Sequence, residues 1–141
     1  MILKDVLKIQ DTQLKNHAIT CTIKGDDFVV HGYKNEFKQV LLNIIQNCTD
    51  SISGVGQITL TTEAQDSSII IKFEDTGCGI FEGDKKYLFE PFFSTKVAEQ
   101  GTGLGLSISY GIIRDHGGDI EVESELDKGT TFIISIPIKI K

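Results

Sequence analysis

The stretch QVLLNIIQNCTDSI, residues 39–52, decides how the rest of the chain is interpreted. Its apolar residues recur at helical spacing, which predicts a helix over 35–52 with one buried face. Beside that face runs a polar stripe, with members at intervals of four, four and three: Gln39, Asn43, Asn47 and Asp50. An amide oxygen can ligate Mg²⁺ and an amide NH₂ can donate to phosphate. The same amides could equally satisfy buried backbone groups or cap a neighbouring loop.

The composition is that of one globular domain. The chain has 141 residues, of which 40% are hydrophobic and 24% charged, enough for a single core. No run approaches the roughly 20 apolar residues of a membrane span, and charges interrupt the apolar N-terminus where a signal peptide would have none. We therefore expect a cytoplasmic domain, whose parent protein can be membrane-anchored. The net charge of −6, with Arg114 as the only arginine, argues against nucleic acid as a partner.

The cysteines are Cys21, Cys48 and Cys78, an odd number without a CxxC pair. Neither a disulfide framework nor a zinc site fits this pattern. We expect thiols that are buried or incidental.

Helices and strands follow one another in a pattern typical of an α+β fold. Helices are predicted within 2–15, over 35–52 and over 104–115, the last closing at Gly117-Gly118, where glycine can take the left-handed conformation. Strands are predicted, mostly in adjacent pairs, over 18–24, 27–32, 56–64, 67–75, 119–125 and 130–138. We expect a two-layer α/β sandwich, with a mixed sheet of about five strands and three main helices on one face. The stretch 76–103 is long for a loop inside a compact domain and is therefore a functional candidate.

Two glycine-rich motifs bound that stretch. In EDTGCGI (74–80) a strand runs into Asp75, and Gly77 and Gly79 allow a tight turn and close approach of a flat ligand. The Asp75 carboxylate is placed to accept from an amino group, although such a motif alone could be an ordinary turn. GTGLGLSI (101–108) precedes a helix, where backbone N–H groups can bind an anion. It fits neither a P-loop nor G-x-G-x-x-G.

Together and in this order, the three motifs resemble the N, G1 and G2 boxes of the ATP-binding domain of sensor histidine kinases, a Bergerat-type fold. LFEPFFSTK (88–96) resembles the F box of that family. Gyrase, mismatch-repair and chaperone ATPases share the first two boxes, but not FEPFFSTK followed by GTGLGL. The residues after Asn47 are most similar to nitrogen-regulation and dicarboxylate-sensing kinases. The resemblance implies that residues 1–15 are the tail of a junction and residues 16–141 the catalytic domain.

The resemblance also implies a nucleotide site. Asn47 would ligate Mg²⁺, Asn43 would lie beside the phosphates, and Asp75 would bind the adenine amino group. We expect Lys96 to meet the γ-phosphate when the lid is closed and Asp50 when it is open, although a solvated lysine is the alternative. The other members would shape the adenine pocket or the glycine-rich hinge: Gly77, Gly79, Ile80, Gly101, Thr102, Gly103, Leu104, Gly105, Leu106 and Thr130.

Residues 82–102 would form a lid over the nucleotide. Its phenylalanines, Phe89, Phe92 and Phe93, either anchor the lid on the core of the domain or dock on a partner.

The implied function is that of a protein-histidine kinase in two-component signalling. The domain would bind Mg-ATP and pass its γ-phosphate to a histidine on a separate dimerisation hairpin, serving a response regulator indirectly. In relatives that hydrolyse ATP a glutamate stands where this chain has Asn43, and an amide cannot act as a base, so we expect slow intrinsic hydrolysis. None of His17, His31 and His116 suits an acceptor hairpin, so the acceptor should be absent and the domain monomeric.

Three alternatives have other consequences. A serine kinase of the anti-sigma type would phosphorylate serine instead of histidine. A non-catalytic nucleotide-binding interaction module would keep the fold without turnover. An ATPase clamp of the gyrase kind is disfavoured by Asn43.

Overall fold

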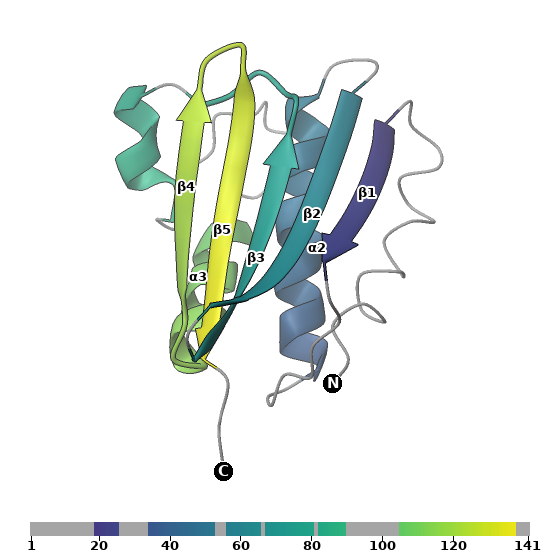
Figure 1. The fold of residues 1–141 in the computed structure, drawn as a ribbon. Helices are drawn as coiled ribbons and strands as arrows, with labels where there is room; N and C mark the ends of the chain where they lie inside the picture. Colours follow the sequence, from purple (N-terminus) through teal and green to yellow (C-terminus); the bar gives the residue numbers. More distant parts are fainter. Residues whose placement is uncertain are drawn as a thin grey trace.

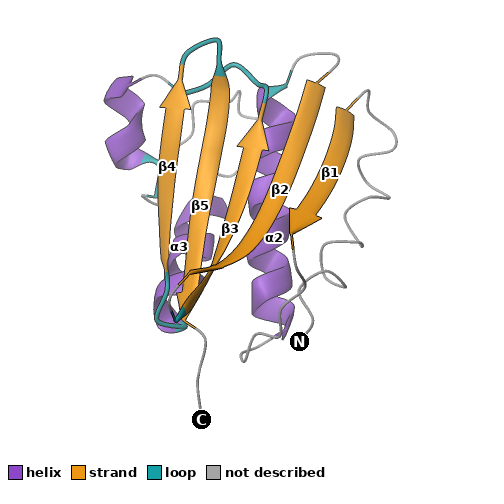
Figure 2. Cartoon of the chain, in the orientation of Figure 1, coloured by secondary structure: helices purple, strands orange, loops and turns teal. Residues whose placement is uncertain are grey.

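The computed structural model describes residues 19–25, 34–52, 56–65, 67–80, 82–89 and 105–137. Within them, two helices cover one face of a five-stranded sheet, and the other face is open (Figures 1 and 2). These two helices are α2 (Lys34–Ser51) and α3 (Gly105–Asp115), and the described residues also include a short 3₁₀ helix, η1 (Glu82–Tyr87). The strands are β1 (Ile19–Gly25), β2 (Gly56–Gln65), β3 (Ser68–Asp75), β4 (Asp119–Glu125) and β5 (Gly129–Pro137).

The sheet has the strand order β1-β2-β3-β5-β4. The β1–β2 pair is parallel and the other three pairs are antiparallel. Along β3 and β5 every second side chain is buried against the helices, as the two-residue period of a strand requires. The expected α+β sandwich with a mixed sheet is therefore confirmed.

The core lies between α2, α3 and the sheet. The helix α2 contributes Phe37, Val40, Leu41, Ile44, Ile45 and Cys48, each at most 4% exposed. These residues recur every three or four positions, so they share one face of the helix and the stripe of amides is turned to its flank. Ile58, Leu60, Ile71 and Phe73 meet them from the sheet. The buried face of α2 thus fixes where its polar stripe lies.

The end of α3 has the expected left-handed glycine. Gly117 has φ of 80°, its N–H donates to the carbonyl of Arg114, and the N–H of Gly118 donates to that of Ile113. This is the Schellman pattern of helix termination. His116 stacks on Phe37 at a centroid distance of 4.4 Å, and one ring nitrogen lies 2.8 Å from the carbonyl of Ile112. This histidine therefore has a structural role.

The stretch 76–103 is not simply a loop, which corrects the prediction. Residues 82–87 form η1, whose 3₁₀ geometry leaves no periodic apolar pattern in so short a sequence. Leu88, the residue after η1, is buried. Phe89 packs on the core and stacks on Tyr110, with 5.1 Å between the ring centroids. Phe89 thus takes the first of its two expected roles, anchoring on the core. The predicted helix in 2–15, the strand 27–32, Phe92 and Phe93 lie outside the described residues.

Candidate functional site

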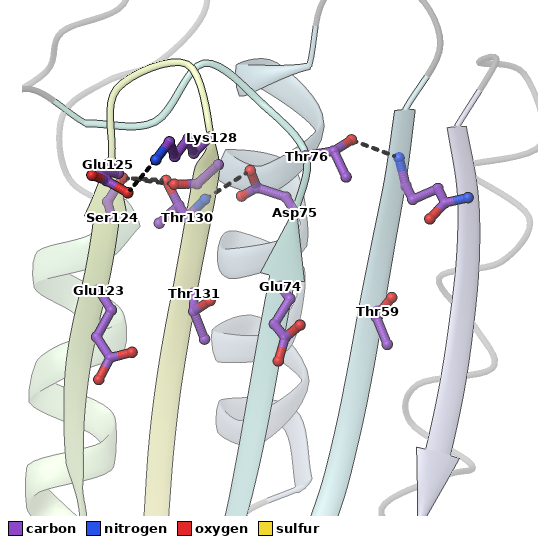
Figure 3. A pocket seen from close by; sticks show the side chains of 12 residues that line it. Thr59, Glu74, Asp75, Thr76, Glu123, Ser124, Glu125, Lys128, Thr130 and Thr131 are labelled. Atoms are coloured by element: carbon purple, nitrogen blue, oxygen red, sulfur yellow. Dashed lines mark hydrogen bonds and ion pairs between the residues drawn. The ribbon is translucent and has the colours of Figure 1, made fainter.

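A row of side chains crosses the sheet at one end, on the face that carries the helices. The strand registers place Ile58 opposite Asp75, Asp75 opposite Thr130, and Thr130 opposite Ser124. Figure 3 shows Asp75, Thr130 and Ser124 at the ends of β3, β5 and β4. The row brings together two residues predicted for the adenine pocket, Asp75 and Thr130, and adds Ser124, which the sequence did not single out.

Asp75 is buried, 7% exposed, and its Oδ1 is surrounded by donors. It accepts from the N–H of Gly77 at 2.9 Å and from that of Thr130 at 3.3 Å, and the hydroxyl of Ser51 lies 3.3 Å away. Burial raises the pKa of the Asp75 carboxyl above its ordinary 3.8, and hydrogen bonds from Gly77, the Cys48 thiol, Thr130 and Ser51 act in the opposite direction. The hydrogen bonds from Gly77, Thr130 and Ser51 all use Oδ1, so Oδ2 is the candidate acceptor for a ligand that donates.

The two glycines of the DTGCG turn are required by the protein itself. A Cβ on Gly77 would collide with the side chain and backbone of Ser51, and one on Gly79 would collide with the carbonyl of Glu125. Gly79 also has φ of 76°, which disfavours other residues. The turn is clamped by Cys78, whose N–H donates to Ser51 and whose carbonyl accepts from Asp127. The sequence predicted that these glycines allow a tight turn and the approach of a flat ligand. The structure shows the turn and its close packing on α2 and the β4–β5 hairpin, and the ligand role stays a prediction.

The amide stripe of α2 is hydrogen-bonded along its length. Gln39 donates to Oδ1 of Asn43 at 2.9 Å, and Nδ2 of Asn43 donates to the hydroxyl of Ser109 on α3 at 3.1 Å. Nδ2 of Asn47 donates to the backbone carbonyl of Asn43 at 2.8 Å. Asn43 therefore joins α2 to α3, a role that the sequence did not predict, whereas Asn47 bonds a backbone carbonyl, which is one of the structural roles that the sequence left open.

Some of the remaining predicted site residues are described by the structure and the others are not. Asp50 accepts from Gln46 at 2.8 Å on the outer side of α2. Ile80 donates its N–H to Ser124, and Leu106 at the start of α3 packs on the core. Gly105 is the first residue of α3. The predicted members outside the described residues are Lys96, Gly101, Thr102, Gly103 and Leu104.

The residues present fit a magnesium ion that is held mainly by phosphate. Asn47 offers an amide oxygen, the only atom of its side chain that can ligate a cation, because the NH₂ group only donates. Nδ2 donates here to the helix backbone. The described residues hold no group of three or more His, Cys, Asp or Glu side chains suited to a metal. Mg²⁺ bound with ATP needs few protein ligands, since phosphate and water oxygens fill most of its octahedron.

The open face of the sheet carries a shallow concavity of about 630 Å³. Thr59, Glu74, Thr131 and Glu123 point into it from four neighbouring strands (Figure 3). The only described cation at its rim, Lys128, is paired with Glu125 at 3.4 Å. This acidic lining disfavours phosphate. Asp75, Ser124 and Thr130 also border this concavity, at the end of the sheet. Strand alternation nevertheless turns their side chains to the other face from those of Glu74, Glu123 and Thr131, so we assign the candidate site to the helix-bearing face.

Comparison with known proteins shows which family has this arrangement. Residues 32–140 match the family described as histidine kinase-, DNA gyrase B-, and HSP90-like ATPase, and the chain belongs to that family. The catalytic domain of histidine kinase ThkA, in a nucleotide-free form, superposes with a TM-score of 0.82 at 34% identity, covering 95% of this chain and 88% of that one. Within the family, this chain is a histidine-kinase catalytic domain.

The relatives are longer proteins. Sporulation kinase E of Bacillus subtilis (strain 168) is 38% identical over an alignment of 141 positions, which covers 98% of this chain and 19% of that kinase. ThkA in complex with the response regulator protein TrrA superposes with a TM-score of 0.79 at 30% identity, covering 97% of this chain and 39% of ThkA. The chain thus spans about a fifth of the length of sporulation kinase E. Among the described helices, none has the length and apolar character needed to cross a membrane.

Proposed function

We propose that this domain binds Mg-ATP between α2 and the ends of β3 and β5, and donates the γ-phosphate to a histidine on a separate helical hairpin. One observation carries the proposal. Asp75 is a buried carboxylate whose Oδ1 is held by protein donors, so that Oδ2 can accept from a ligand on the face of the sheet that also bears the α2 amides. Membership of an ATPase family supports ATP as that ligand.

Each residue has a defined task in this proposal. Asp75 accepts from the adenine amino group, and Thr130 lies beside it at the base of the pocket. Asn47 holds Mg²⁺ through Oδ1, and the ion, when bound, neutralises phosphate charge. The glycine-rich segment 101–105 and Lys96 then contact the phosphates. Transfer depends on positioning and charge neutralisation, because this domain supplies no covalent intermediate.

Slow hydrolysis of ATP is expected because of Asn43, the second residue of the amide stripe. Asn43 stands one helical turn before Asn47, and its amide is bonded to Gln39 and Ser109. An amide cannot take a proton from water at neutral pH, so water near the γ-phosphate is not activated by this side chain. We therefore expect ATP turnover far below the ~1–1,000 s⁻¹ common among enzymes. The bound nucleotide is kept for the acceptor.

The acceptor and the downstream partner lie outside this domain. The hairpin with the phosphorylated histidine belongs to the same parent protein in this proposal, and a receiver domain of a response regulator takes the phosphoryl group from it. The complex of ThkA with TrrA supports a partner of this kind. We expect the isolated domain to be a monomer located in the cytoplasm.

Calorimetric titration with a non-hydrolysable ATP analogue, with and without Mg²⁺, tests the nucleotide step. We expect binding that Mg²⁺ strengthens, and absence of binding by the folded chain would overturn the proposal. Radiolabelled ATP offered with an isolated histidine hairpin tests the transfer step. Label that appears on histidine but not on a serine substrate supports the kinase, whereas label on serine alone would assign the domain to serine kinases. Rapid phosphate release by the pure domain would refute the argument from Asn43.

A further inference from the structure

Ser124 is the polar hub of the site, although no motif in the sequence marks it. It lies on β4 directly opposite Thr130, which is itself opposite Asp75 on the other side of β5. Its hydroxyl lies within hydrogen-bond distance of three groups: the Ile80 N–H at 2.7 Å, the Gly129 carbonyl at 3.0 Å and the Thr130 hydroxyl at 2.9 Å. Figure 3 shows the contact between Ser124 and Thr130.

The direction of each of these hydrogen bonds follows from the number of protons. A serine hydroxyl has one proton and two lone pairs. The carbonyl of Gly129 can only accept, so it takes the proton of Ser124, and the N–H of Ile80 can only donate, so it uses one lone pair. The second lone pair of Ser124 faces Thr130, which must therefore donate its own hydroxyl proton.

The directions of these hydrogen bonds determine whether the base of the pocket accepts or donates toward a ligand. Thr130 is buried, 5% exposed, and with its proton directed to Ser124 its oxygen can only accept from a ligand. Asp75 also accepts, as an ionised carboxylate does. Two neighbouring acceptors fit a ligand edge that carries an amino group with two hydrogens. They disfavour a ligand edge that carries a carbonyl oxygen, because two hydrogen-bond acceptors would then face each other without a proton between them.

We propose that Ser124 is a positioning residue that fixes the Thr130 hydroxyl as an acceptor, and so sets the preference of the pocket for 6-amino over 6-oxo purine nucleotides. The inference rests on the proposed nucleotide-binding function. It adds the residue that controls the hydrogen-bond direction, and it links the turn after β3, through Ile80, to the β4–β5 hairpin. Without Ser124, Thr130 can turn its proton toward the ligand and accommodate a carbonyl.

The test compares the binding of ADP and of inosine diphosphate, which differ at position 6 of the purine. Wild-type domain is expected to prefer ADP. Ser124→Ala should reduce the ratio of the two affinities about five- to tenfold, the effect of one neutral hydrogen bond. Ser124→Thr keeps a hydroxyl at the same position and should retain the wild-type ratio. Circular dichroism confirms that each variant is folded.

Thr130→Val provides a second variant that does not depend on the folding of Ser124→Ala. It should weaken the binding of ADP, which loses an acceptor, and should not weaken that of inosine diphosphate, whose carbonyl no longer faces the Thr130 oxygen. Adding Ser124→Ala to Thr130→Val should not change the ratio further. If Ser124→Ala leaves the ratio of the two affinities unchanged, the proposal is refuted. If both affinities fall equally, Ser124 has only a structural role. If wild-type domain binds neither nucleotide, it is the nucleotide-binding function that has failed.

Discussion

Replacement of Asp75 by asparagine should separate nucleotide binding from stability. The amide keeps an oxygen, and this oxygen should stay toward the N–H groups of Gly77 and Thr130, since an NH₂ placed there would face donors. Nδ2 then points to the ligand, where it opposes another amino group. A hydrogen bond to a charged acceptor contributes ~1.5–3 kcal/mol, and the unsatisfied donors add ~1–3 kcal/mol. Binding should therefore weaken by at least about 100-fold.

The free domain should respond in the opposite direction. Burial raises the pKa of Asp75, so the folded state binds its proton more tightly than the unfolded state does. The stability associated with this proton is fully present below the ordinary pKa of 3.8 and is lost as the pH rises through the raised value. Asp75→Asn carries no such ionisation. It should be more stable than wild type at pH 7, and the difference should shrink as the pH is lowered toward 3.8.

Two assays and one control decide the matter. Titration calorimetry with an ATP analogue gives the affinity, and urea unfolding at several pH values gives the free energy of unfolding. Glu74→Gln removes a carboxylate from the adjacent position, where the side chain is exposed on the open face. It should leave the affinity within about twofold, since it breaks no contact on the helix-bearing face. Affinity of Asp75→Asn close to wild type would refute the role of Oδ2, and an unchanged stability at pH 7 would refute the argument from burial.

Three further predictions follow from local geometry. Gly111→Ala should stabilise the domain by about 0.5–1 kcal/mol, seen as a rise in melting temperature, because a Cβ at this helical position meets nothing within 4 Å. Gly77→Ala should destabilise the domain by about 1–3 kcal/mol and weaken nucleotide binding, because a methyl group at this position would overlap Ser51. The free energies of unfolding of the two variants, measured under the same conditions, test both predictions. Cys78 is exposed and Cys48 is fully buried, so mass spectrometry after brief alkylation should find Cys78 modified and Cys48 intact, and Mg-ATP should slow the reaction at Cys78. Modification of Cys48 first would contradict the packing of α2.

The fold was predictable where the sequence is locally periodic. The apolar spacing of α2 and the alternation along β3 and β5 reflect burial on one face, and this pattern is visible within the sequence of each segment. Gly117 could be placed because the left-handed end of a helix demands glycine. By contrast η1 escaped prediction, since a single 3₁₀ segment has no repeating pattern.

The sequence names Asp75 and Thr130 as site candidates through their motifs and family resemblance; the structure places them opposite each other on β3 and β5, and their role in binding stays a prediction. The supporting contacts could not be predicted. Asn43 and Ser109 are 66 positions apart, and Ile80 and Ser124 are 44 apart. Such pairs depend on which helix faces are adjacent and on the registers of β3, β4 and β5. These are properties of the assembled sheet, and no local stretch of sequence contains them.

Asp75 and Ser124 show two different ways of keeping a polar group in the site. The hydroxyl of Ser124 uses its proton and both lone pairs within the protein, so its burial is compensated without a ligand. At Asp75 burial raises the pKa of the carboxyl, and the hydrogen bonds around it act in the opposite direction. Packing alone would favour a neutral side chain at this position. In the proposed function a ligand with an amino group adds a donor to this carboxylate. The burial of Asp75 and its place beside Thr130 and Ser124 in the row are why we propose the nucleotide base at Asp75 and the control of its orientation at Ser124.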